Sequence, residues 1–246
     1  MTITPANLED RLHAHLTNHY MQLHGMLVSV TLGAAGFAAA NIATSTGGKE
    51  DSGLLPWILW SGALLAILVV YTGTVTGVFA LPAGIPSVWD LVVPLAIGLA
   101  QFMLFGALTR SVAHFTTSYG MVRAWFFAMA AFGAFATVGI LRARHLVNVT
   151  SYHATLTDGV KYYRSRLMSD VAGAGALTLV SAVGGGLRVG GADISQFWTY
   201  VNVSAVLLVL TIGLVMHHTT GKELRKKIRD ASVSNPPPPG YPIPPA

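Results

Sequence analysis

Six long apolar stretches, almost free of formal charge, dominate this sequence. Asp90 is the only Asp, Glu, Lys or Arg between residues 52 and 109. Four further stretches contain no such residue at all: 12–48, 124–141, 171–187 and 194–221. About 20 helical residues cross the ~30 Å hydrocarbon core of a bilayer, where every backbone amide must be bonded within the chain. The pattern therefore predicts an all-α polytopic integral membrane protein.

We predict about six transmembrane helices with short cytoplasmic helical extensions. The predicted spans are Met26–Ala43, Leu54–Leu81, Val88–Leu108, Ala124–Leu141, Val171–Leu187 and Phe197–Met216. The fifth has the weakest signal, because it is rich in Ala and Gly and ends near Gly184-Gly185-Gly186, where helix propensity is low. A re-entrant segment at 171–187 is the alternative to a sixth crossing.

The composition agrees with a membrane environment. The 246 residues are 52% hydrophobic and only 10% charged, against about 25% in soluble domains. The sequence contains no cysteine, which excludes disulfides, Cys-based zinc sites, iron–sulfur clusters and thiol catalysis.

The basic residues predict an orientation. In a six-span arrangement with a cytoplasmic N-terminus, 11 of the 15 Lys and Arg lie inside. The four outside are Lys49, Arg110, Arg123 and Arg188. We therefore expect a multi-pass protein of the cell membrane with both termini cytoplasmic, in contact with anionic headgroups and not with nucleic acid. All five tryptophans fall near the start of a predicted span, as expected of interfacial indoles: Trp57, Trp60, Trp89, Trp125 and Trp198.

The organisation along the chain has four parts. Residues 1–24 form a cytoplasmic amphipathic helix that runs into the first span, with an apolar series at spacings of three and four: Leu8, Leu12, Leu16, Tyr20 and Leu23. Residues 25–218 form the six-span domain, including a cytoplasmic segment at 142–170. Residues 219–233 form a basic cytoplasmic helix, and the Pro-rich residues 234–246 a disordered tail.

Histidine is the most unusual polar residue, and most of the nine are expected on the cytoplasmic side. His15 and His19 stand four apart on one helical face, a spacing that suits two ligands of one metal ion. Glu9, or His217 and His218, would complete such a set. A second interpretation of these histidines is a pH-sensitive switch. The alternative without a function is that the histidines are simply tolerated at the membrane interface, where a half-polar ring is stable. We therefore assign no catalytic, cofactor-binding or metal-binding residue.

Inside the predicted spans the main polar residues are Asn41, Gln101 and Asn202, and no ionisable group is expected at mid-bilayer. This weakens ion-coupled secondary transport, which usually needs such a group. Small residues form faces at Gly73-x-x-x-Gly77, Gly33-x-x-Gly36 and along 173–184, which we expect to pack mainly within one subunit. A weak similarity between the regions around His19 and His114 suggests an inverted repeat, in which the first three spans correspond to the last three.

These observations favour a non-enzymatic multi-pass membrane protein acting as a pore, a transport subunit or a membrane-embedded component of a larger complex, including a homo-oligomer. The alternative is a metal- or haem-binding redox protein, or a pH-sensitive regulator, that uses the cytoplasmic-side histidines.

Overall fold

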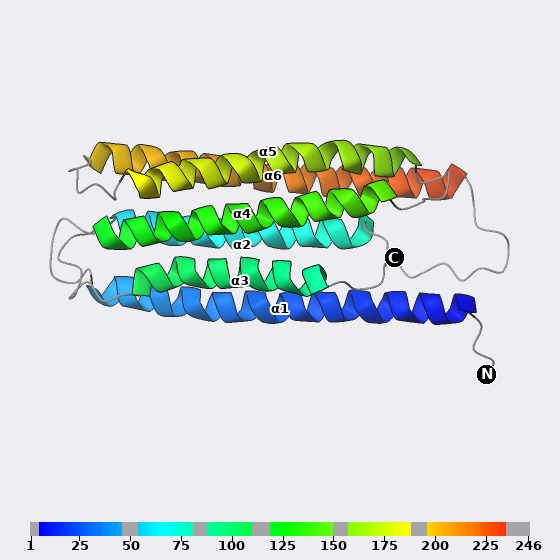
Figure 1. Ribbon diagram of the computed structural model, residues 1–246, viewed down its shortest axis with the longest axis horizontal. Coiled ribbons are helices and arrows are strands. Elements are labelled where there is room, and N and C mark those ends of the chain that lie inside the picture. Colours follow the sequence, from blue (N-terminus) through cyan, green and yellow to red (C-terminus); the bar gives the residue numbers. More distant parts are fainter. Residues whose placement is uncertain are drawn as a thin grey trace.

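A computed structural model gives the fold of the chain as a bundle of six long helices (Figure 1). It describes residues 5–45, 54–80, 88–109, 119–149, 157–187 and 196–234. Within these ranges the regular elements are all helices: α1 (Pro5–Ser45), α2 (Leu54–Ala80), α3 (Val88–Thr109), α4 (Tyr119–Val149), α5 (Thr157–Gly186) and α6 (Gln196–Ser234). Each contains an apolar segment of at least 18 residues that is long enough to cross a membrane. The predicted fold class is therefore confirmed.

The helices form two layers of three (Figure 1). One layer holds α3, α4 and α5 with α4 in the middle, and the other holds α1, α2 and α6 with α2 in the middle. The inverted repeat would make the α4–α5 contact equivalent to the α1–α2 contact. Instead, α4 and α5 share the most extensive interface in the bundle, whereas α1 and α2 share a small one. The packing therefore does not follow that repeat.

The doubtful fifth segment is one uninterrupted helix. Its apolar part, Gly159–Gly186, has 28 residues, which is more than a crossing needs. Glycine allows it to lie very close to α4: a Cβ on Gly133 would be 3.0 Å from the backbone nitrogen of Thr178 and 3.1 Å from the carbonyl oxygen of Ala174. Close approach of two helix backbones at small residues is the usual way membrane helices pack. The structure thus favours a spanning helix over a re-entrant one.

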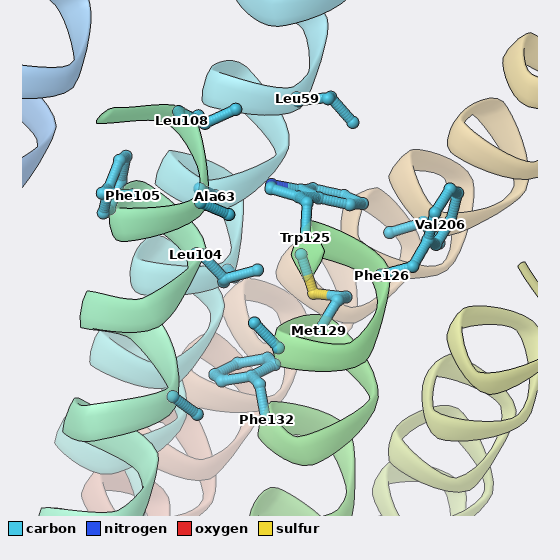
Figure 2. Packing of buried hydrophobic residues seen from close by; sticks show 14 of the residues in the cluster. Leu59, Ala63, Leu104, Phe105, Leu108, Trp125, Phe126, Met129, Phe132 and Val206 are labelled. Atoms are coloured by element: carbon cyan, nitrogen blue, oxygen red, sulfur yellow. The ribbon is translucent and has the colours of Figure 1, made fainter. Parts of the chain in front are cut away.

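An aromatic core lies between the layers and is centred on α4 (Figure 2). We define it by Leu59, Ala63, Leu104, Phe105, Leu108, Trp125, Phe126, Met129, Phe132 and Val206. Trp125 is 0% exposed, so the prediction that it marks a membrane interface is wrong. Trp60 is also half-buried and donates a hydrogen bond of 2.9 Å to the carbonyl of Ala35, joining α2 to α1. Trp89 and Trp198 are exposed, as interfacial residues would be.

At one end of the bundle, two helices extend beyond the others. At this end α1 begins and α6 finishes, and both reach past the end of α2 and the start of α3 (Figure 1). We call it the basic end, because the Lys and Arg of α4, α5 and α6 that follow or precede the apolar cores lie there. The predicted cytoplasmic segment at 142–170 continues α4 to Val149 and begins again with α5 at Thr157.

A second, smaller apolar cluster holds the three basic helices together. It comprises Val147 of α4, Tyr163 and Leu167 of α5, and Leu224 of α6. The Pro-rich residues 235–246, the basic residues Lys49, Arg110 and Arg188, and the side chains of His13, His15, His19, Asp90, Arg225 and Arg229 lie outside what the structure describes.

Candidate functional site

A cluster of polar side chains joins α5 and α6 near the basic end. We define this polar cluster as Arg166 and Asp170 of α5 with His217 and Thr220 of α6. Arg166 donates a hydrogen bond of 2.9 Å from Nε to the Thr220 hydroxyl, which itself donates to the Met216 carbonyl at 2.8 Å. The Asp170 carboxylate interacts electrostatically with both His217 and Arg166. A carboxyl group, a guanidinium group and an imidazole ring therefore interact with one another in this cluster.

Helix α2 contacts the polar cluster through a glycine. A Cβ on Gly73 would lie 3.2 Å from Cε1 and 3.3 Å from Nε2 of His217. The imidazole ring thus occupies the space that a side chain at position 73 would need. Any movement of the ring changes the contact between α2 and α6.

A second histidine lies on another side of α2. His24 of α1 stacks on Tyr71 with ring centroids 6.0 Å apart and planes at 21°. His24 is only 6% exposed, and its Nε2 has no hydrogen-bond partner among the described residues. An unpaired buried polar atom is costly, so such atoms commonly mark a site of function or of unseen water. One end of α2 is therefore in contact with an imidazole from α1 and another from α6.

The structure places His217 near Asp170 of α5 and Gly73 of α2. It does not place His217 in a group of metal ligands among the described residues. Among the residues it describes, no three His, Asp or Glu side chains lie close enough to share a metal ion. His218 is exposed. The proposed ligands His15 and His19 cannot be placed, because their side chains fall outside the described part of the chain.

The sequence reasoning did not single out Arg166 and Asp170 as site residues. A usable signal was present: the two stand four apart, so on a helix they share one face. What the sequence does not contain is the alignment of α5 with α6, which puts His217 beside that face.

The three polar residues singled out inside the spans have different surroundings, and one of them joins two helices. Asn41 donates to the carbonyls of Leu108 and Thr109 at 3.3 and 3.1 Å, which ties α1 to the end of α3. Asn202 bonds within its own helix to Trp198. Gln101 is 3% exposed in α3, and its side-chain nitrogen has no partner among the described residues.

The small-residue faces divide into two kinds. Gly73 and Gly184 pack within the chain, against His217 and Phe126 respectively, as predicted. Gly33 and Gly36 of α1 have open space where a Cβ would stand, as do Gly173 and Gly175 of α5. These positions do not contribute to packing inside this bundle.

Fold, composition and apolar helices together define the class: a multi-pass α-helical membrane protein. No protein-family model matches the chain, and neither the curated proteins nor the solved structures include a significant match. A functional conclusion therefore depends on the geometry of this chain alone.

Proposed function

We propose that this protein is a non-enzymatic component of a larger assembly. It is embedded in a cell membrane, with its basic end facing the cytoplasm. The observation that carries the proposal is the length of α1. The helix has 41 residues, about 60 Å at ~1.5 Å per residue, whereas its apolar segment is Gln22–Thr44. About 25 Å of helix therefore precedes the span.

The direction of this extension matters as much as its length. Helix α1 continues in line with its own span and runs past the end of α2 (Figure 1). A helix that continues along its span points away from the bilayer and does not lie in the interface. The sequence series Leu8, Leu12 and Leu16 predicts an apolar face on this extension, and an apolar helix face is stable in water only when it is buried. We infer that a partner subunit covers this face.

The interior of the bundle does not favour a pore within one chain. The aromatic core fills the space between the layers with Trp125, Phe126, Met129 and Phe132, all at most 1% exposed. A conducting role would therefore require a pathway between subunits, which again calls for an assembly.

The test is partner capture through the α1 extension. Cross-linking in native membranes followed by purification in mild detergent should give a complex larger than one chain. Leu12→Glu with Leu16→Glu should dissociate it, because the two changes put charge on the apolar face. Ala14→Glu is the matched control, since position 14 falls on the opposite side of the helix. A strictly monomeric protein that cross-links to nothing would overturn the proposal.

A second function, a pH-sensitive regulator, is supported by the polar cluster. His217 faces Asp170 and Arg166 and fills the notch at Gly73, so a change in its charge would alter how α2, α5 and α6 pack. Imidazole titrates near physiological pH. The expected result is a structural transition on acidification below about pH 7 that His217→Gln abolishes and His218→Gln retains. A flat response in the unaltered protein would rule this function out.

A further inference from the structure

The basic end carries a strong excess of positive charge on three adjoining helices. Among the side chains described there, eight are Lys or Arg and three are Asp or Glu. The basic residues are Arg142, Arg144, Lys161, Arg164, Arg166, Lys222, Lys226 and Lys227, and the acidic ones are Asp170, Glu223 and Asp230. Asp170 is already committed to the polar cluster. Among these described side chains, the basic residues thus outnumber the acidic ones.

Two of these arginines belong to the same corner of the bundle. Arg164 of α5 donates a hydrogen bond of 3.2 Å to the carbonyl of Val147, near the end of α4. Arg144 stands three residues before Val147, so both lie on one face of α4. The small apolar cluster of Val147, Tyr163, Leu167 and Leu224 forms a packed base beneath this corner. The Arg164 guanidinium is therefore fixed to the end of α4, the helix that carries Arg144 one turn earlier.

Arg144 supplies the indication of a missing ligand. Its Nε is buried and has no hydrogen-bond partner among the described residues. A guanidinium group presents its donors in a planar fork that matches the oxygens of a phosphate, and it always carries its charge. An anion at this corner would accept a hydrogen bond from Arg144 and add a charge-assisted contact.

The level of the corner identifies the anion. The apolar segment of α4 ends at Asn148 and that of α5 begins at Gly159, so Arg144 and Arg164 lie close to the ends of these segments, where we expect the lipid headgroups. Two residues before Arg164, the ring of Tyr162 lies 5.8 Å from the Lys227 ammonium, an aromatic and cation pair typical of that level. We propose that Arg144 and Arg164 bind the phosphate of an acidic phospholipid. This site does not depend on the α1 extension or on any partner subunit.

The test measures lipid binding to the purified full-length chain in phosphatidylcholine nanodiscs. Titrated phosphatidylglycerol should bind selectively, and Arg144→Gln should weaken it about fivefold, the change that ~1 kcal/mol per surface charge gives. Arg164→Gln should have a similar effect. Arg123→Gln is the matched control, because Arg123 is an exposed cation at the other end, 5.6 Å from the Phe127 ring.

Two further measurements separate binding of a lipid headgroup from a simple charge effect and from binding of a soluble phosphate. Arg144→Lys retains the charge without the planar fork and should bind with intermediate affinity. Soluble glycerol phosphate should compete poorly, because it lacks the acyl chains that hold the headgroup at this level. Equal binding of phosphatidylglycerol and phosphatidylcholine would overturn the proposal, as would equal losses in the Arg144 and Arg123 variants or full competition by glycerol phosphate.

Discussion

The two halves of the bundle are held together in different ways. Away from the basic end, α2, α3, α4 and α6 meet in the aromatic core, where large side chains interdigitate (Figure 2). Near the basic end, polar and charged groups join α5 to α6, and the His217 ring of α6 packs against Gly73 of α2. Lipid tails are as apolar as leucine, so in a membrane the first half gains from close packing and the second from specific polar contacts. We therefore expect the first half to determine stability and the second to respond to its surroundings.

The largest effect is expected in the aromatic core. Trp125→Ala removes a side chain that is 0% exposed and leaves a cavity that the neighbouring helices cannot fill, at a cost of about 3 to 5 kcal/mol. Thermal unfolding in detergent measures the loss. Trp198→Ala is the control, because this indole is 56% exposed and its removal should change stability little. Equal losses in the two variants would contradict the idea of a packed half.

A smaller effect is expected where α4 and α5 approach most closely. Gly133→Ala places a Cβ against the backbone of α5, which cannot move without separating the helices, so we expect a loss of about 1 to 3 kcal/mol. At Gly175 of α5 the same change meets open space and should be neutral or slightly stabilising, since Ala is the better helix former. The same unfolding measurement compares the two. If Gly133→Ala is neutral, the close approach of these helices is wrong.

The smallest effect is expected at Gly73. Gly73→Ala displaces only the His217 ring, which is a side chain and can yield, so the loss should be about 1 kcal/mol. A double-mutant cycle with His217→Ala isolates this contact, because the smaller residue at 217 should remove most of the penalty. Additive losses in the cycle would show that position 73 acts through some other neighbour.

The sequence was sufficient to predict the six helices and not the contacts between them. Hydropathy and length depend on each segment alone, so the spans and the all-helical class followed directly. Trp125 was misread because its position near the start of a span says nothing about which face of α4 is buried. Likewise, the pairing of His217 with Asp170 depends on the relative height of α5 and α6. That height results from packing between the helices, and no periodicity in either helix encodes it.

The six-span arrangement is the claim on which both halves of the comparison depend, and cysteine accessibility tests it most directly. The chain has no cysteine of its own, so a single substitution gives a clean reporter. Lys161→Cys and Lys226→Cys at the basic end, and Leu54→Cys and Leu187→Cys at the other, replace exposed residues. In sealed cells, a membrane-impermeant maleimide should label the last two from outside, and the first two only after the membrane is opened. Labelling of positions 161 and 187 from the same side would contradict the account, because α5 would then not cross the membrane.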